Sequence, residues 1–289
     1  MNREAANQQL QSVLQFEKVP SLIRYFSSER VRLDLLSWQT LEESRQDQSK
    51  KVLTFMICHH YKCIFVHIPK NAGQSIEHVF VNLLGLDWET RAPLLLRPND
   101  RPELGPPRLA HLKADEYVRF NYLPQEMFDD YFKFTFVRNP WSRLVSIYKF
   151  MGYDKKIDFR LFLLGMFKKY IFERHNWFVG LQSDFVYSKE GELLMDYIGR
   201  FEDLQNGFDF VCTQIGIPKT KLPHINESES NNSMPDLTDD QRDMGLDEIT
   251  GTKTLPDYQN YQEYYDEDTI DCVAQLYRKD IMLFGYEFV

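Results

Sequence analysis

Two segments of the chain follow the same order of patterns: a short apolar stretch, a loop, and then apolar side chains at helical spacing. In the first, residues 63–68 (CIFVHI) have the length and composition of a strand buried on both faces of a parallel sheet. The loop 69–73 follows, and apolar residues from Ile76 to Leu84 then line one side of a helix that ends near Gly85. This is one strand, loop and helix unit.

The second unit starts at residues 133–138 (KFTFVR), which again read as a strand. Asn139 is suited to cap the helix that follows, and Pro140 to occupy its first turn. The apolar stripe of that helix is Trp141, Leu144, Val145 and Tyr148. Because two β-then-α units require parallel strands, the sequence predicts an α/β fold, a single domain with a central parallel sheet flanked by helices.

The remaining elements are assigned from weaker patterns. We expect strands at 184–187 and 193–201, a helix at 202–215 and a closing helix at 266–284, whose first turn is acidic. Residues 1–50 are polar, with sparse helical periodicity, and are read as an N-terminal helical extension. The domain then spans 51–289 and includes an acidic surface excursion at 227–256 that is poor in aliphatic side chains.

Composition excludes several classes of protein. Hydrophobic residues make up 43% of the chain and aromatic residues 15%, which rules out a mainly disordered protein. A net charge of -9 argues against a general binder of nucleic acid or anionic membranes, so a polyanionic ligand needs a local basic patch. No apolar run approaches the ~18 residues of a membrane span, and the N-terminus lacks the pattern of a signal peptide. We therefore expect a cytoplasmic protein without a transmembrane segment.

The four cysteines show no spacing typical of a disulfide framework or a metal site. They are scattered, with no CxxC pair and no Cys/His cluster: Cys58, Cys63, Cys212 and Cys272. We expect buried thiols, and neither a disulfide nor a bound metal.

The loop 67–75 (HIPKNAGQS) has the features of an anion site. It joins a buried strand to a helix, where free backbone N–H groups and the helix dipole favour negative charge. Gly73 allows the backbone to approach a phosphate or sulfate, Ser75 adds a hydroxyl, and Lys70 adds a positive charge. It is not a Walker A loop, because Lys70 does not directly precede a Ser or Thr. The alternative is an ordinary turn with a surface lysine.

Arg138 and Ser146 indicate a second anion site. Arg138 follows a strand at the edge where open α/β sheets bind ligands, and Ser146 lies two turns into the next helix. The alternative is a salt-bridged surface arginine and a serine without function. Arg143 and Lys149 flank Ser146 and are read as a solvated helix face.

Both loops resemble motifs of one enzyme family. HIPKNAGQS is similar to the 5′-phosphosulfate loop of the family 2 sulfotransferases, the Golgi carbohydrate sulfotransferases and their microbial relatives, and residues 134–150 (FTFVRNPWSRLVSIYKF) are similar to their 3′-phosphate motif. The resemblance extends over roughly residues 60–289, apart from the acidic excursion, through 196–204 (DYIGRFEDL), 222–228 (LPHINES) and 264–286.

This resemblance implies a sulfotransferase fold, similar to that of P-loop kinases, and transfer of a sulfuryl group from 3′-phosphoadenosine 5′-phosphosulfate to an acceptor hydroxyl. It implies that Lys70 contacts the 5′-phosphosulfate and that Arg138 and Ser146 hold the 3′-phosphate. The neighbouring loop residues would bind the 5′-phosphate: Asn71, Ala72, Gly73, Gln74 and Ser75. Arg200 and Phe201 join the candidate nucleotide site, since Phe201 could stack on adenine; the alternative is a phenylalanine that points into the core.

Transfer to a hydroxyl needs a general base. The resembled family places a catalytic histidine between its two nucleotide motifs, where this chain has His111, and Glu77 is the second candidate. The alternative for His111 is a structural or substrate-orienting role. His224 is a further site candidate in a segment that lies near the nucleotide in the family. His67 is instead expected to be buried and bonded to the backbone, and His78 to be solvated.

The acceptor is less well defined by the sequence. The family suggests a sugar hydroxyl in a glycan or glycolipid, and the acidic chain favours a neutral or lightly charged acceptor. The loops 87–108, 151–180 and 227–256 should determine its identity, although the basic and aromatic stretch 155–170 is better explained by core packing. Alternatives are a non-catalytic nucleotide or glycan binder, and an NTP-dependent kinase, which lacks its Lys-Ser/Thr pair here.

Overall fold

The computed structural model describes residues 56–89, 91, 95–225 and 255–289. The expected N-terminal extension and nearly all of the acidic excursion lie outside these residues. The described strands are β1 (Ile57–Cys58), β2 (Cys63–Phe65), β3 (Phe132–Val137) and β4 (Tyr197–Arg200). The longer helices are α4 (Gly73–Leu83), α7 (Pro140–Phe150), η5 (Leu161–Ile171), α11 (Leu204–Ile215), α13 (Glu267–Leu276) and α14 (Arg278–Phe284).

Short helical segments connect these elements. They are η2 (Pro102–Leu104), η3 (Leu109–His111), α5 (Glu116–Arg119), α6 (Gln125–Asp130), η4 (Tyr153–Lys155), α8 (Phe172–Arg174), α9 (Asn176–Val179), α10 (Ser183–Val186), η6 (Phe201–Asp203) and η9 (Tyr261–Tyr264). None of the helices in the described part of the chain is long and apolar enough to cross a membrane. The cytoplasmic location stays a prediction.

The four strands form one sheet in the order β1-β2-β3-β4. β2 pairs with β3 and β3 with β4 in parallel, while β1 forms an antiparallel hairpin with β2. The parallel pairing aligns the carboxyl ends of β2, β3 and β4 at one edge of the sheet. The predicted single α/β domain with a central sheet flanked by helices is confirmed, and the sheet is parallel as predicted except for the strand β1.

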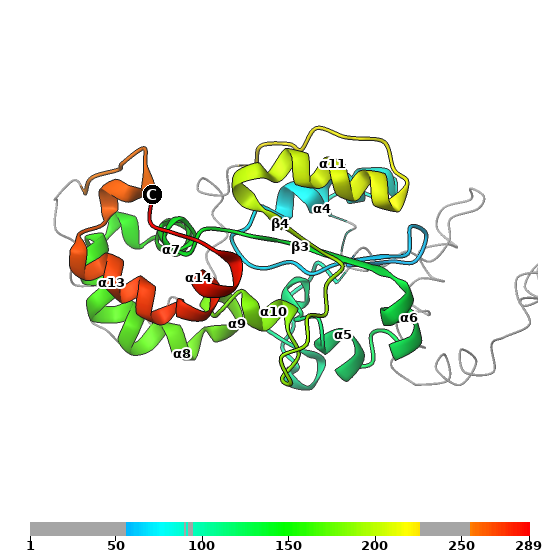
Figure 1. Ribbon diagram of the computed structural model, residues 1–289, viewed down its shortest axis with the longest axis horizontal. Helices are drawn as coiled ribbons and strands as arrows, with labels where there is room; N and C mark the ends of the chain where they lie inside the picture. Colours follow the sequence, from blue (N-terminus) through cyan, green and yellow to red (C-terminus); the bar gives the residue numbers. More distant parts are fainter. Residues whose placement is uncertain (1–55, 90, 92–94, 226–254) are drawn as a thin grey trace, which may run out of the picture. The chain divides into compact units, whose positions relative to one another are not determined.

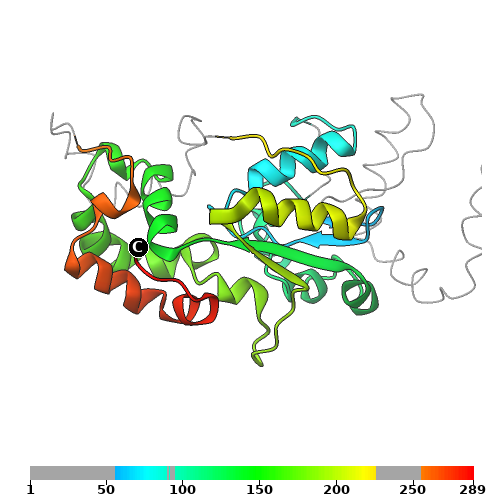
Figure 2. The ribbon, with the colours of Figure 1, turned by 45° about the horizontal axis from the view of Figure 1, so that its top comes forward.

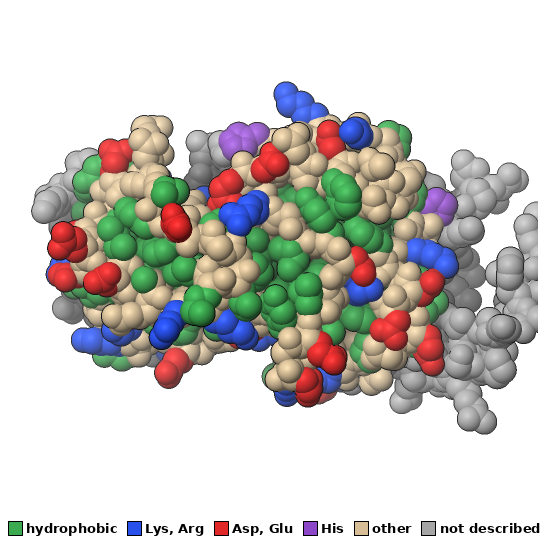
Figure 3. All heavy atoms as spheres, in the orientation of Figure 1, with side chains coloured by type: hydrophobic (Ala, Val, Ile, Leu, Met, Phe, Trp, Pro, Cys, Tyr) green, Lys and Arg blue, Asp and Glu red, His purple; other side chains and the backbone are tan. Residues whose placement is uncertain are grey.

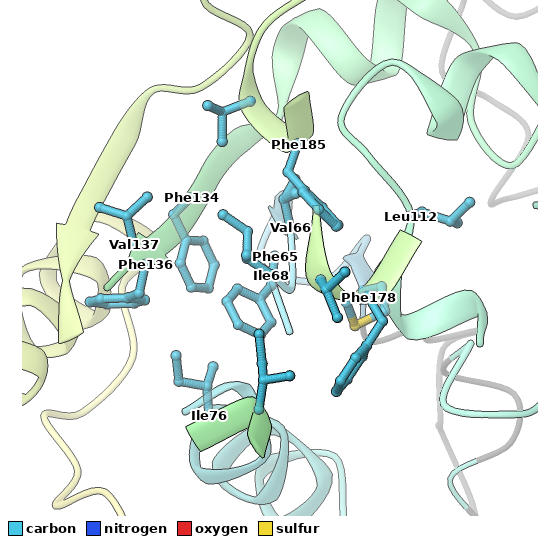
Figure 4. Packing of buried hydrophobic residues seen from close by; sticks show 14 of the residues in the cluster. Phe65, Val66, Ile68, Ile76, Leu112, Phe134, Phe136, Val137, Phe178 and Phe185 are labelled. Carbon is cyan, nitrogen blue, oxygen red and sulfur yellow. The ribbon is translucent and has the colours of Figure 1, made fainter. Parts of the chain in front are cut away.

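Helices cover both faces of the sheet. α4 and α11 lie side by side on one face, and α5, α6 and α10 lie on the other (Figures 1 and 2). Phe134 of β3 stacks on Phe65 of β2 at 5.1 Å between ring centroids, and Phe80 of α4 contacts both Phe134 and Phe208 of α11. Figure 4 shows Phe65, Phe134 and Ile76 in this shared interior. Burial of these aromatic surfaces holds the helices on the sheet.

The two predicted strand, loop and helix units are present. α4 ends where Gly85 adopts a left-handed φ of 63°, a conformation that glycine favours. Asn139 caps α7, since its side-chain oxygen accepts hydrogen bonds from the amides of Trp141 and Ser142, and Pro140 occupies the first turn.

Three other expected elements differ from the structure. Residues 184–187 are not a strand, because the buried Asp280 carboxylate accepts hydrogen bonds from the amides of Gln182 and Ser183 and so supports the start of the helix α10. Strand β4 is also shorter than the expected 193–201. The predicted helix 266–284 is divided at Tyr277, whose hydroxyl donates to Val179 O at 2.6 Å.

Candidate active site

A cleft of about 1040 Å³ opens at the carboxyl ends of β2, β3 and β4. Segments from six parts of the chain line it, within residues 67–77, 88–111, 138–150, 201–205, 222–225 and 258–264. Phe178 completes the lining. Open α/β sheets bind ligands at this edge, where loops from parallel strands converge.

The loop after β2 presents the start of α4 to the cleft. Lys70 and Ala72 adopt left-handed backbone conformations, with φ of 68° and 61°, and Ala72 offers no side-chain cap to the helix. The first turn of α4 thus lines the cleft without a side-chain cap, and the N-terminus and dipole of an 11-residue helix favour an anion there. The Lys70 ammonium lies 4.1 Å from the ring centroid of Phe150.

Gly73 is required for a reason that differs from the one inferred from the sequence. Its φ is not left-handed, but a Cβ at this position would lie 2.0 Å from His67 Nε2. The imidazole of His67 therefore packs directly under the loop, in the space that any other side chain at position 73 would need. Whether Gly73 also admits a phosphate stays a prediction.

His67, Glu77 and His111 form a compact buried group. His67 Nδ1 lies 2.6 Å from Glu77 Oε1, so the carboxylate accepts a hydrogen bond from the ring, which was expected to be bonded to the backbone instead. The imidazoles of His67 and His111 meet edge to face at 4.5 Å between centroids. All three side chains line the cleft. Glu77 faces the cleft, but its carboxylate is hydrogen-bonded to His67.

His111 is held in one tautomer. Its Nδ1 donates to the carbonyl oxygen of His67 at 3.1 Å, which leaves Nε2 as the nitrogen with a lone pair. Burial lowers the pKa of His111 well below its usual value, and the adjacent His67 and Arg108 act in the same direction. The imidazole is therefore neutral at pH 7 and able to accept a proton.

Arg138 joins the two loops. Its Nη1 donates to Lys70 O at 3.1 Å and its Nε to Ser142 Oγ at 3.0 Å, and its guanidinium lies 4.1 Å from the ring centroid of Phe201. Burial lowers the pKa of Arg138 to about 10, so it is still protonated at neutral pH. Ser146 lies one turn beyond Ser142 on α7, and both line the cleft.

Three predicted residues lie differently from the expectation. Arg200 is exposed and does not line the cleft; it donates to Phe284 O and lies over the ring of Tyr286. Asn71 is buried outside the lining, with its amide nitrogen bonded to Phe136 O and Gln182 Oε1. Arg143 is not solvated but 1% exposed.

The other predicted residues line the cleft: Lys70, Ala72, Gly73, Gln74, Ser75, His111, Ser146, Phe201 and His224. His78, expected to be solvated, is half-buried and stacks on Trp88 at 4.1 Å. The aromatic side chains of 155–170 pack largely into the core, and this stretch contributes nothing to the lining.

Two residues that the sequence analysis did not assign to the site hold the loops in place. Arg143 donates to three carbonyl oxygens, those of Pro69, Gly180 and Phe178, and so fixes the start of the first loop. Gln182 bonds the backbone of Arg138 and the side chain of Asn71. In the sequence, Arg143 is distinguished by its helical spacing from apolar residues, which is unusual for a solvated arginine. Nothing local in the sequence marks Gln182.

The cleft is positively charged although the chain is acidic. Among the described residues that line it, six are Lys or Arg and one, Glu77, is a carboxylate. The basic residues are Lys70, Arg91, Arg97, Arg108, Arg138 and Lys149. This is the local basic patch that a polyanionic ligand needs in a chain of net charge -9.

Comparison with known proteins identifies the family. Residues 53–287, which include every described part of the cleft, match the sequence profile of the sulfotransferase family. The chain belongs to this family. The general chemistry of a sulfotransferase is the transfer of a sulfuryl group.

Matches to individual proteins add little information on the activity of this chain. The chain is 30% identical over 115 residues to a protein of Archaeoglobus fulgidus described as uncharacterized, an alignment that covers 39% of this sulfotransferase and 90% of the archaeal protein. No solved structure matches the chain.

Proposed function

We propose that this sulfotransferase transfers a sulfuryl group from 3′-phosphoadenosine 5′-phosphosulfate to a hydroxyl of a carbohydrate, in a glycan or glycolipid, with His111 as the general base. The observation that carries the proposal is the convergence of three groups on one cleft: the uncapped start of α4 with Lys70, the Arg138 and Ser146 pair, and the neutral imidazole of His111.

The donor's charges match the cleft. The uncapped start of α4 and the Lys70 ammonium suit the 5′-phosphosulfate, because backbone dipoles and a lysine act together on a concentrated negative charge. Arg138 and Ser146 offer a guanidinium and a hydroxyl to a second anion, the 3′-phosphate. Phe201 is held under Arg138 and offers an aromatic face near the same site for the adenine.

The proposed transfer forms one bond to sulfur and breaks another. A bond forms between the acceptor oxygen and sulfur, and the bond from sulfur to the bridging phosphate oxygen breaks, with its electron pair leaving on that oxygen. The acceptor proton passes to His111 Nε2, the nitrogen left free by the bond from Nδ1 to His67 O. Lys70 and the α4 amides would stabilise the charge that develops on the bridging oxygen.

The donor site is tested by calorimetric titration of the full chain with 3′,5′-adenosine bisphosphate, 5′-AMP and ATP. We expect the bisphosphate to bind about ten- to a hundredfold more tightly than 5′-AMP, since a charged hydrogen bond contributes about 1.5–3 kcal/mol. Ser146→Ala and Arg138→Ala should reduce this preference. Arg119 is an exposed arginine paired with Asp115 and Glu116, so Arg119→Ala should leave the preference for the bisphosphate unchanged.

The same titration separates the alternatives. Tight binding of ATP without a preference for the 3′-phosphate would contradict the proposal and favour a kinase. Binding of the bisphosphate without transfer to any carbohydrate would favour a non-catalytic nucleotide or glycan binder.

A further inference from the structure

The sheet ends at β4, and the outer edge of this strand is open. In the described part of the chain β4 pairs with β3 alone, while the opposite edge is formed by β1, which has only two residues. Because alternate residues of a strand in a parallel pair bond to its neighbour, the remaining backbone N–H and C=O groups of β4 point away from the sheet. Such an edge is a template for a further strand.

Apolar side chains border this edge. Phe210 of α11 is 44% exposed and lies beside Tyr197 of β4, with 4.7 Å between ring centroids. Ile198 is half-buried, and Leu193, in the segment that leads into β4, is 50% exposed. Figure 3, in the orientation of Figure 1, shows hydrophobic side chains gathered over β4 and the adjacent side of α11. An open strand edge with exposed apolar surface beside it is typical of a protein-binding site.

The charges at the two ends of β4 indicate which strand fits there. Asp196 directly precedes β4, and Arg200 is its last residue. Both are exposed, and they lie on the same face of the strand because they are an even number of positions apart. A strand with an acidic start and a basic end is complementary to a copy of itself that runs in the opposite direction, since each acid then meets a base.

Two registers centre such a pair within β4. Antiparallel strands form hydrogen bonds between residues of the same alternation, so a twofold axis passes through either Ile198 or Gly199. With Ile198 on the axis, Asp196 lies directly opposite Arg200 of the second copy. With Gly199 on the axis, Asp196 would instead lie opposite Glu202, and like charges in directly opposite positions are destabilising. The charges therefore favour the register centred on Ile198.

Both charged side chains have groups left for this pairing. Asp196 binds Lys133 through Oδ2, which accepts from the Lys133 amide nitrogen and lies 2.8 Å from Lys133 Nζ. Within the described residues, Asp196 Oδ1 has no hydrogen-bond partner. Arg200 donates through Nη2 to Phe284 O, and none of the described carboxylates forms an ion pair with it. Its Nε and Nη1 are therefore available to a carboxylate of a second chain.

We propose that two copies of this chain associate through β4, paired antiparallel about Ile198, so that their sheets become one. Asp196 of each copy forms an ion pair with Arg200 of the other. Tyr197 lies opposite Gly199, which has no side chain to obstruct the ring. Because the paired strands run in opposite directions, the two clefts, at the carboxyl ends of the strands, open toward opposite ends of the joined sheet. The association does not depend on the proposed sulfotransferase reaction.

Sedimentation velocity of the full chain at micromolar concentration tests the association. We expect a species of twice the chain mass of 34.5 kDa. Arg200→Asp puts two acidic residues opposite each other at both ends of the interface. It should raise the Kd of the dimer about ten- to a hundredfold, since each of the two cross-strand pairs changes from attraction to repulsion. Arg119→Asp makes the same change of charge at an exposed residue of α5 and is the matched control.

A mixture of two variants tests the register. Asp196→Lys puts two basic residues opposite each other and should by itself weaken the dimer as Arg200→Asp does. The two variants mixed should associate again, because the mixed pair has an acidic residue opposite a basic one at both ends. Recovery on mixing depends on the proposed register, whereas damage to the fold of either variant would persist in the mixture.

Ile198→Cys gives a second measurement that changes no charge. In the proposed register the two introduced thiols are directly opposite, and Cα atoms in such antiparallel pairs are about 4.5–5.5 Å apart, which is within the range of a disulfide. The native cysteines are buried. We expect mild oxidation to produce a covalent dimer of this variant and none of Glu126→Cys, at an exposed position on α6.

A chain that stays monomeric at these concentrations would overturn the proposal and leave the edge of β4 to a strand of another protein. A dimer that Arg200→Asp leaves intact and that Ile198→Cys does not cross-link would also overturn it, because the copies then use a different surface. Mixed variants that each unfold normally in urea but do not associate would contradict the pairing of Asp196 with Arg200.

Discussion

The side-chain amide of Gln182 pairs with the backbone of Arg138 through two hydrogen bonds. Gln182 Oε1 accepts from the Arg138 amide nitrogen at 2.9 Å, and Gln182 Nε2 donates to the Arg138 carbonyl oxygen at 2.8 Å. The same Oε1 accepts from Asn71 Nδ2 at 2.7 Å. One fully buried glutamine thus sets the distance between the loop after β2 and the loop after β3.

Replacement of Gln182 should therefore disturb both loops. Gln182→Leu keeps the volume but removes the partners that Gln182 supplies to the Arg138 amide and carbonyl, and one of the two hydrogen bonds of Asn71 Nδ2, at a cost of about 1–3 kcal/mol each. We expect a loss of about 2–5 kcal/mol in the free energy of unfolding and a weaker affinity for 3′,5′-adenosine bisphosphate, measured by urea unfolding and calorimetry. The exposed Gln125→Leu is the control. An unchanged affinity would show that Gln182 does not position the donor site.

Gly73→Ala tests the packing of His67 under the loop. The new Cβ would lie 2.0 Å from His67 Nε2, and the ring cannot turn aside without breaking its bond to Glu77. We expect this single variant to lose bisphosphate affinity, and His67→Ala/Gly73→Ala to recover part of it because the space is then vacant. Such non-additivity is the signature of direct contact. Additive losses in the two variants would contradict the contact.

The activity should fall at acid pH with the titration of His111. A base must be unprotonated, and because burial holds the pKa of His111 well below 6.5, transfer should stay constant as pH falls to 6.5 and decline only at lower pH. His111→Gln should reduce kcat by about 10²–10⁴-fold and remove this decline, with bisphosphate affinity nearly unchanged. A pH profile retained in the variant would assign the base elsewhere, with Glu77 the next candidate.

Lys70→Ala tests whether the lysine acts in the transition state. If its ammonium stabilises charge developing on the bridging oxygen, the variant should lose transfer almost entirely while bisphosphate binding falls only partly. Single-turnover rates and calorimetric affinities measure the two effects. Equal losses in both would indicate that Lys70 contributes ground-state binding alone.

Much of the architecture was predictable because it depends on local patterns. The apolar segments before Lys70 and Arg138, the Asn139 cap and the amphipathic spacing of α4 and α7 are short-range features, and each predicted the element that the structure shows. The expectations that were wrong concern segments whose structure depends on contacts with distant residues. Residues 184–187 are apolar enough for a strand, but they form a helical turn because Asp280, almost a hundred positions away, accepts the amides at its start.

The sequence by itself determined the α/β fold, the order of the two loops and the residue types that both loops bring to the cleft, because each follows from neighbours within a turn or two of the chain. Only the tertiary structure decided that His67 bonds Glu77 beneath Gly73, that Arg143 and Gln182 hold the loops, and that Arg91, Arg97 and Arg108 join Lys70, Arg138 and Lys149 as the basic cluster of the cleft that His111 lines. Net charge could not reveal that cluster, since a summed charge carries no information on where folding places each side chain.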